Sequence, residues 1–465
     1  MPYIPNTEED QRRMLESIGA SSVAELFEQI PAELHLDAKP SHDGPGVNSW
    51  TIMAETTMAE TTMAEEPLSE IELRRHFAEL AAKNSTTDEC PSFLGAGIYD
   101  HYIPSTVPAI ISRAEFYTSY TPYQPEISQG TLQSIFEFQT LVCELTGMEV
   151  ANASLYDGAT ALVEAAHMAS HITKRTEWVV SSCVNPAYRE TLRTYAWASE
   201  YTLVEDGRSG VVTDFASLAS RVSDKTACVI VQNPNFFGSI EAMEDAEKLA
   251  HSNGALFVVA FDPISLGLLK TPGDYNADIA VGEGQSLGIP QAFGGPLLGL
   301  FACKQQFVRQ MPGRVVGATK DVDGKPGYVL TLQTREQHIR REKATSNICS
   351  NQGLCALAAT VYLSTVGKQG LRQVAELCAQ KSHYLADEIA KLPGYEVQSG
   401  ARFLKEFVVK CPRPVGEINA KLRDCRTIGG LDLARFYPEL ADHMLLCVTE
   451  KRSKQEIDAL VEGLR

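Results

Sequence analysis

The segment 151–160 contains residue types that could bind an anion. It ends in Gly158, Ala159 and Thr160, just before a helical run at 161–170. Small residues at the start of a helix leave backbone N–H groups free to point at a phosphate, and the positive end of the helix dipole adds attraction. An Asp-Gly turn with a threonine cap accounts for the same residues, and the sequence alone modestly favours that simpler interpretation.

A second candidate is Asp262, which closes the apolar run 256–262 where a strand is expected to end. A buried carboxylate at such a place needs a cationic or protonated partner to offset its desolvation. Because Pro263 follows directly, a role in ending the strand explains Asp262 equally well.

Glycines at 282, 284 and 288 nearly form the fingerprint of a dinucleotide-binding loop, but the third glycine falls one residue late. The fingerprint normally opens a domain, whereas these glycines follow several expected strands, so a nicotinamide cofactor is disfavoured. The turn 294–296 (Gly-Gly-Pro) permits close approach to a ligand or to another subunit, or simply forms a tight turn.

Four cations form a basic stretch in an otherwise acidic chain: Arg335, Arg340, Arg341 and Lys343. Such a stretch could hold an anionic group or dock an acidic protein. A solvated helix face is the more common use of this pattern, and the residues themselves favour it.

The sequence offers two histidines and eleven cysteines as possible metal ligands. His167 and His171 have a spacing compatible with a metal, but no glutamate general base lies between them as in zinc peptidases. The eleven cysteines contain no Cys-x-x-Cys pair. No metal site is predicted, and reduced thiols indicate a cytoplasmic protein.

Charge and hydropathy exclude two classes of partner. The chain has 41 Lys and Arg against 59 Asp and Glu, a net charge of −18, which repels nucleic acid. Its apolar runs are far shorter than the roughly 20 residues that a membrane span needs. No nucleic-acid or membrane partner is therefore expected.

Short apolar runs alternate with helical stretches from about residue 130, in units of the size of a βαβ motif. Right-handed crossovers then imply a mostly parallel sheet between helices, with any ligand at the carboxyl ends of the strands. Strands are predicted at 178–183, 227–232, 256–262, 278–281 and 297–302, and helices at 186–198 and 241–252, among others.

The length of 465 residues predicts a large domain with smaller companions. Residues 1–85 are expected to form a helical arm, in which Thr7 caps the first helix and Met53–Glu66 is a low-complexity repeat. Residues 86–335 form the large α/β domain, and residues 336–465 a small α+β domain. The small domain is predicted to contain a helix at 336–392, broken near Gly367 and Gly370, strands at 403–410 and 444–449, and a last helix capped by Ser453.

Several strings together resemble the alpha subunits of the glycine cleavage system P-protein family, the decarboxylating glycine dehydrogenases. The resemblance covers nearly the whole chain and fails clearly only around residues 37–66. The matching strings are YTPYQPEISQG (120–130), NASLYDGAT (152–160), QNPNFFG (232–238), GEGQSLG (282–288) and REQHIRR (335–341).

The resemblance implies an aspartate-aminotransferase-like fold, fold type I of the pyridoxal-phosphate enzymes. It implies decarboxylation of glycine with pyridoxal phosphate and transfer of the aminomethyl group to the lipoyl group of the H-protein. The expected partners are a beta subunit, in an α2β2 assembly, and the lipoylated H-protein.

The family's Schiff-base lysine follows a histidine in the beta subunit, but the corresponding turn here reads Gln285-Ser286. This chain is therefore expected to lack a covalent cofactor and to be inactive alone. By resemblance, Tyr120 and Tyr123 line the active site across the subunit interface. Asp262, which would face the pyridine nitrogen, and residues 158–160 (Gly158, Ala159 and Thr160) would be remnants of a duplicated cofactor site.

Two alternatives remain open at this point. The chain could be a non-catalytic structural or regulatory scaffold of the same complex. It could also be a self-sufficient enzyme that uses an unexpected lysine, such as Lys270 or Lys304.

Overall fold

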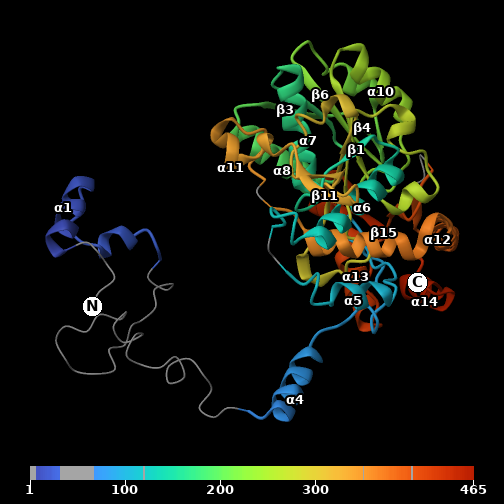
Figure 1. The fold of residues 1–465 in the computed structure, drawn as a ribbon. Helices are drawn as coiled ribbons and strands as arrows, with labels where there is room; N and C mark the ends of the chain where they lie inside the picture. Colours follow the sequence, from blue (N-terminus) through green and yellow to red (C-terminus); the bar gives the residue numbers. More distant parts are fainter. Residues whose placement is uncertain (1–6, 32–67, 119–120, 349, 399–401) are drawn as a thin grey trace. The chain divides into compact units, whose positions relative to one another are not determined.

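The computed structural model describes residues 7–31, 68–118, 121–348, 350–398 and 402–465, and the chain divides into two compact units, Met1–Asn84 and Ser85–Arg465 (Figure 1). The repeat at Met53–Glu66 lies outside the described residues. The first unit contains α1 (Glu8–Ile18), the 3-10 helix η1 (Ala24–Phe27) and α4 (Glu70–Ala81).

The two α-helices described in the first unit each begin with a capping box. The Thr7 hydroxyl accepts the N–H of Asp10, and the Asp10 carboxylate accepts the N–H of Thr7. Ser69 and Glu72 form the same reciprocal pair at the start of α4. The predicted cap at Thr7 is confirmed, because each pair satisfies backbone donors that have no partner within the helix.

A seven-stranded sheet forms the centre of the second unit, in the order β1-β9-β8-β7-β6-β2-β3. Neighbours from β8 through β3 are parallel, whereas β9 runs antiparallel to both β8 and β1. The mostly parallel sheet is confirmed, and each predicted strand overlaps an observed one. The bounds are β1 (Val150–Ala151), β2 (Glu177–Ser181), β3 (Thr202–Asp206), β6 (Thr226–Asn233), β7 (Leu256–Phe261), β8 (Ile279–Glu283) and β9 (Gly299–Cys303).

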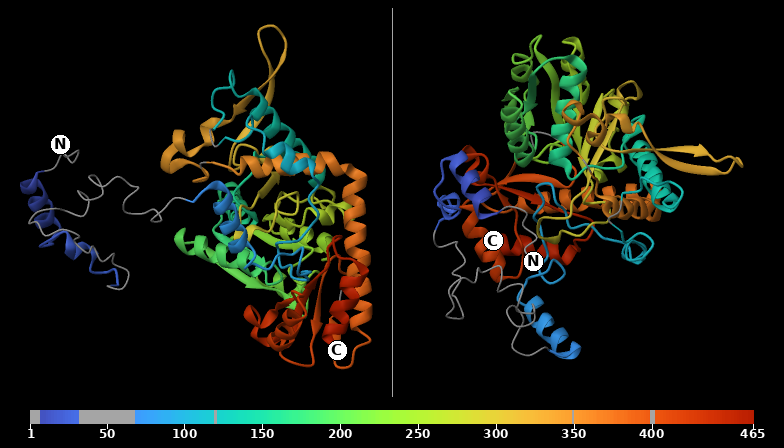
Figure 2. Two further views of the ribbon diagram at one scale, coloured as in Figure 1. Left: turned by 90° about the horizontal axis from the view of Figure 1, so that it is seen from below. Right: turned by 60° about the vertical axis from the view of Figure 1, so that its left-hand side comes forward.

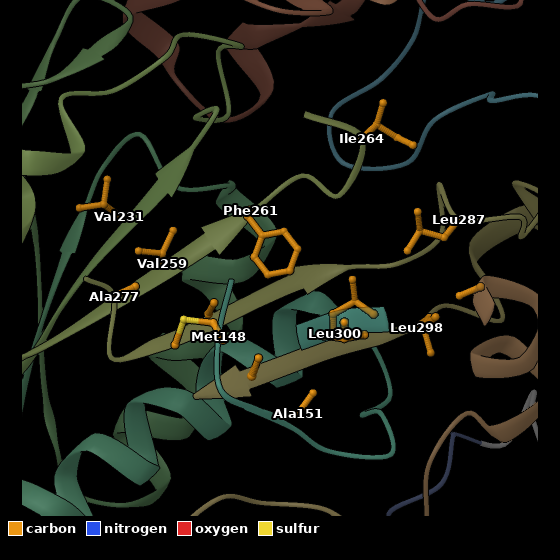
Figure 3. Close-up of a cluster of buried hydrophobic side chains, with 14 of the residues drawn as sticks. Met148, Ala151, Val231, Val259, Phe261, Ile264, Ala277, Leu287, Leu298 and Leu300 are labelled. Carbon is orange, nitrogen blue, oxygen red and sulfur yellow. The ribbon is translucent and has the colours of Figure 1, made fainter. Parts of the chain in front are cut away.

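Helices cover both faces of this sheet, and the strands alternate between the two cores. In β7, Phe257, Val259 and Phe261 pack into one cluster with residues of α6, α10 and α12, part of which Figure 3 shows. Val258 and Ala260 pack into the other cluster, with α7 and α8. The bounds are α6 (Gln129–Thr146), α7 (Gly158–Thr173), α8 (Pro186–Ala198), α10 (Met243–Ser252) and α12 (Gly353–Ile389).

The C-terminal part contains a four-stranded antiparallel sheet in the order β12-β13-β15-β14, packed with α13 and α14. The predicted cap of the last helix at Ser453 is confirmed. The bounds are β12 (Glu396–Gln398), β13 (Glu406–Lys410), β14 (Leu431–Asp432), β15 (His443–Cys447), α13 (Val415–Asp424) and α14 (Lys454–Leu464).

The long helix begins later than predicted. It runs from Gly353, not from residue 336, and it is interrupted at Gly367, whose φ of 60° lies in the left-handed region. Upstream, Leu332 and Arg341 also have positive φ values, which end regular helix at both places. Only short pieces form there: η7 (Gln333–Arg335), α11 (Gln337–Arg340) and η8 (Arg341–Lys343).

Smaller elements complete the second unit. The antiparallel pair of β10 (Val315–Lys320) and β11 (Pro326–Thr331) forms a hairpin that projects from the unit (Figure 2). Within the described residues, no helix combines the length and the apolar character needed to cross a membrane. The remaining bounds are α5 (Thr106–Ile111), α9 (Phe215–Ala219), β4 (Arg208–Ser209) and β5 (Val212–Thr213), with 3-10 turns η3 (Ile264–Gly267), η4 (Gly273–Tyr275), η5 (Ala292–Gly294), η6 (Gln305–Phe307), η9 (Leu433–Arg435) and η10 (Pro438–Leu440).

Candidate functional site

The turn after β8 carries Gln285 and Ser286, both buried. The Gln285 amide oxygen accepts the N–H of Tyr99 at 2.9 Å, and its NH2 group donates to the carbonyls of Tyr99 and Ile289 at 3.0 and 2.7 Å. The Gln285 side chain therefore links the backbone at Tyr99 to the backbone at Ile289. Neither side chain has an amine that could form a Schiff base.

Asp262 follows β7 at the carboxyl edge of the sheet, as predicted, and its partner is Lys405. The Lys405 Nζ lies 3.0 Å from one Asp262 carboxylate oxygen and 2.9 Å from the other. The Lys405 side chain is 3% exposed. Burial by itself lowers the pKa of Lys405, but the charge of Asp262 and of neighbouring groups outweighs it, so the pKa is raised and the amine stays protonated.

Two further side chains lie against the Lys405 ammonium. Its Nζ lies 3.4 Å from the centroid of the Tyr99 ring and 3.3 Å from His101 Nε2. Glu406, the next residue, accepts the Tyr99 hydroxyl at 2.7 Å and the N–H of Ala96 at 2.6 Å. Burial raises the pKa of Glu406 to about 7, partly offset by the Ala96 N–H. The result is a packed polar network with one cation at its centre.

The start of α7 places Gly158, Ala159 and Thr160 at one helix N-terminus, where the sequence predicted an anion cradle. The cap is Asp157 and not a threonine, because the Asp157 carboxylate accepts the N–H of Thr160 at 2.8 Å. Helix α7 also begins at Gly158, three residues earlier than the predicted run.

A carboxylate of this chain already occupies the α7 cradle. One Glu283 oxygen accepts the N–H of Gly158 at 2.9 Å, and the other accepts the N–H groups of Gln285 and Leu298 at 2.9 Å each. Burial raises the pKa of Glu283 to about 7, although these three N–H groups pull it down. Leu298, whose N–H binds this carboxylate, belongs with Leu287 to the hydrophobic cluster of Figure 3.

Tyr188, from α8, packs against the N-terminus of α7 at Gly158. A Cβ atom added at Gly158 would lie 2.3 Å from the Tyr188 hydroxyl and 3.1 Å from Glu283 Cβ. Asp262, which would face a pyridine nitrogen, is engaged by Lys405, and the Gly158 N–H, which would face a phosphate, is engaged by Glu283. The residues present do not fit a bound pyridoxal phosphate in this conformation.

A second polar group surrounds Tyr123, whereas Tyr120 lies outside the described residues. Arg314 Nη2 donates to the Tyr123 hydroxyl at 3.3 Å, and the guanidinium carbon lies 5.5 Å from the ring centroid. Glu336 lies 3.8 Å from the Arg314 guanidinium, and the ring of His338 packs edge-on against Tyr123 at 5.6 Å. Arg314 is buried, while Tyr123 is 41% exposed.

Arg314 also lines an open pocket of about 570 Å³ beside this group. Its walls come from residues 116–118, from Thr121 and Pro122, from α6 and from residues around Asn351. Asn351 donates to the carbonyl of Ala153 at 2.9 Å, which ties this wall to the loop between β1 and α7. A buried cation that lines an open pocket and also holds an exposed phenol can help to bind and orient a small polar substrate.

Of the other sequence candidates, His171, Arg335, Arg340 and Lys343 line a separate pocket. His167 lies among the rings of Trp178, Tyr195 and Tyr201, and burial lowers its pKa to about 4. Among the described residues, one group has metal-ligand geometry: His101, Cys378 and Glu450, with ligand atoms within 4.8 Å of one another. His101 is already engaged there, by Glu450 at 2.6 Å and by Lys405.

Lys405, Glu283 and Arg314 were not identified from the sequence as site residues. Lys405 and Glu406 stand inside the apolar run 403–410. These two charged residues inside an apolar run were the only sequence signal of a buried site, because a strand buries a charged side chain only when that charge is paired. Arg314 lies in a loop without a comparable pattern.

Glu164, in the body of α7, provides a test by pH. Burial raises its pKa to about 7, only partly offset by a hydrogen bond from Ser346. Because the folded pKa exceeds the unfolded value, stability is lost as pH rises from about 4.5 through 7. Glu164→Gln is therefore expected to raise the free energy of unfolding relative to wild type at pH 8 by about 2 kcal/mol, with a higher denaturation temperature, but to have no such effect at pH 4.5.

The exposed Glu190→Gln on α8 is the control for this pH series and is expected to have no effect at either pH. Thermal denaturation followed by circular dichroism measures both variants. A Glu164→Gln protein that is equally destabilised at both pH values would contradict the account.

Comparisons with known proteins connect these features. The family model described as glycine cleavage system P-protein matches residues 1–464. The chain is 52% identical over 464 residues to the probable glycine dehydrogenase (decarboxylating) subunit 1 of Desulforamulus reducens, covering 100% of this chain and 99% of the relative. It is 51% identical to the same-named protein of Carboxydothermus hydrogenoformans, with the same coverage.

Solved structures agree with this relationship. An inhibitor-bound glycine decarboxylase (P-protein) of the glycine cleavage system superimposes with a TM-score of 0.81 at 41% identity, covering 100% of this chain and 99% of that one. A sphingosine-1-phosphate lyase of Burkholderia pseudomallei shares the fold alone, with a TM-score of 0.63 at 14% identity over 86% of this chain and 91% of that one. The expected fold type I architecture is confirmed, and the chain belongs to the glycine cleavage system P-protein family.

Proposed function

We propose that this chain is the first subunit of a two-chain glycine dehydrogenase (decarboxylating), which removes CO2 from glycine and passes the aminomethyl group to a lipoylated H-protein. The observation that carries the proposal is the filled pocket of this chain. Lys405 and Glu283 engage the groups that would hold a cofactor, and Gln285-Ser286 stands at the turn of the missing lysine. A lysine-bearing beta subunit then supplies the pyridoxal phosphate, which acts as the electron sink of the reaction.

In this arrangement Tyr123, with Tyr120, lines the active site from across the subunit interface. Arg314 supports the role of Tyr123, because it holds the phenol oxygen at 3.3 Å and adds positive charge beside the open pocket. A positive wall suits the carboxylate of glycine. The chain thus contributes binding and orientation, while the partner holds the cofactor.

The complex is proposed to be an α2β2 assembly that works in the cytoplasm. The relatives' name, subunit 1, supports a second subunit. Ten described cysteines are free thiols, which suits a reducing compartment.

Lys270 and Lys304 are poor candidates for a cofactor lysine. Lys270 pairs with Glu244 at 2.8 Å in an exposed ion pair. Lys304 pairs with Asp278 at 2.6 Å, beside the end of β9 that faces the amino end of β8. The pocket around Asp262 lies at the opposite, carboxyl edge of the sheet.

The proposal is tested by measuring exchange of bicarbonate with the glycine carboxyl group, in the presence of H-protein, for this chain, for its partner and for the mixture. We expect exchange only in the mixture, and borohydride reduction followed by peptide mapping should place the pyridoxyl group on the partner. Full exchange by the isolated chain would contradict the proposal.

A non-catalytic scaffold is the second candidate, because a filled pocket also suits a subunit that only supports its partner. The two candidates differ in what they require of the Tyr123 hydroxyl, and the kinetics of a Tyr123 variant separate them.

A further inference from the structure

A cavity of about 490 Å³ lies at the far end of α7 from the filled pocket. It is formed where the last residues of α7 meet the segment after η6, the turn at η7, and α11 with η8. The described residues that line it include six basic side chains: His171, Lys174, Arg309, Arg335, Arg340 and Lys343. From Gly158 to His171, α7 rises by about 20 Å, so the cavity is separate from the filled pocket at Gly158.

The wall of this cavity is organised around Arg335. This buried guanidinium donates to the carbonyls of Leu332, Met311 and Gly313, and it thereby holds the turn at η7 against the segment before β10. At the end of α7, Lys174 is the C-cap, with a left-handed φ of 62°. Hydrogen bonds therefore fix the backbone segments that carry the basic side chains of the cavity.

Most of the positive charge in the cavity has no acidic partner among the described residues; the exception is Arg335, which interacts with the charge of Glu336. None of the described lining residues has a carboxylate. Across the described residues, Lys174, Arg309, Arg340 and Lys343 form no ion pair. This holds even though the chain as a whole is acidic, with a net charge of −18. Burial and the neighbouring Lys174 both lower the pKa of His171. Like charges gathered in one concavity repel one another unless an anion joins them.

The remaining lining residues indicate which class of ligand fits. Thr334, Thr345 and Gln310 supply hydroxyl and amide groups. Among the described lining residues, His171 is the only one with an aromatic ring that could stack on a base. A concave wall of cations from four segments suits a compact ligand with several charged oxygens better than a broad protein surface.

We propose that this cavity binds a small multivalent oxyanion of the oligophosphate class. The site is independent of glycine chemistry, so its existence does not depend on the proposed function. The residues of the basic stretch then have two roles. Arg335 holds the wall of the cavity in place, while Arg340 and Lys343 contact the ligand.

Isothermal titration of the full chain with inorganic tripolyphosphate at about 0.15 M salt tests the proposal. We expect a dissociation constant below about 1 mM for the wild type. The double variant Arg340→Gln, Lys343→Gln should bind at least about tenfold more weakly. Both residues are exposed, so the variant should keep the wild-type denaturation temperature.

The matched control is Lys320→Gln, Lys325→Gln, which removes the same charge from the tip of the β10–β11 hairpin. It should bind like the wild type. Equal loss of binding in both double variants would show general charge attraction and overturn the proposal. So would an absence of binding at millimolar tripolyphosphate, or binding of polyglutamate alone.

Discussion

Replacing Lys405 by methionine is expected to lower the free energy of unfolding by about 3–5 kcal/mol. The substitution leaves the Asp262 carboxylate buried without its cation, and among the described residues this carboxylate has no other hydrogen-bond partner. Most of the loss comes from this uncompensated charge, because methionine conserves much of the volume. Urea denaturation followed by circular dichroism measures the loss.

Two further variants decide the cause of this effect. Adding Asp262→Asn to Lys405→Met should restore a large part of the stability, since it removes the charge that was left unpaired. Lys270→Met is the matched control, because Lys270 and Glu244 form an ion pair of the same length with side chains 69% and 60% exposed. It should cost no more than about 1 kcal/mol. Equal losses in Lys405→Met and Lys270→Met would refute the buried pair as a stabilising feature.

Tyr123→Phe in the reconstituted two-chain enzyme is expected to reduce kcat/KM for glycine by about tenfold to a hundredfold. The substitution removes only the hydroxyl that Arg314 holds, and leaves the ring that packs against His338. A shared active site needs that oxygen in place when the substrate is oriented. The measurement is the rate of lipoyl-dependent glycine decarboxylation at several glycine concentrations.

Assembly must be followed in the same samples, by light scattering after size exclusion. Tyr102→Phe is the control, because Tyr102 is an exposed tyrosine, 62% accessible, that does not line the pocket beside Arg314. It should leave both kinetics and assembly unchanged. If Tyr123→Phe also assembles normally and keeps wild-type kinetics, the chain acts as a scaffold and the proposed active-site role is wrong.

Much of the fold could be predicted from patterns that act locally. The alternation of apolar runs identified β2, β6, β7, β8 and β9, because each strand is buried on both faces. The helix caps at Thr7 and Ser453 could be predicted, since a capping box depends only on two residues three positions apart. The long helix was misjudged at its start, because the positive φ values at Leu332 and Arg341 come from their tertiary setting.

The absence of a lysine at the Gln285-Ser286 turn was determined by the sequence alone, since a missing amine needs no coordinates. What occupies the pocket instead was decided only by the tertiary structure. Lys405 reaches Asp262 across 143 positions of the chain, and Glu283 reaches Gly158 across 125. Charge pairing over such separations depends on which strands the fold places together, and no local pattern specifies that.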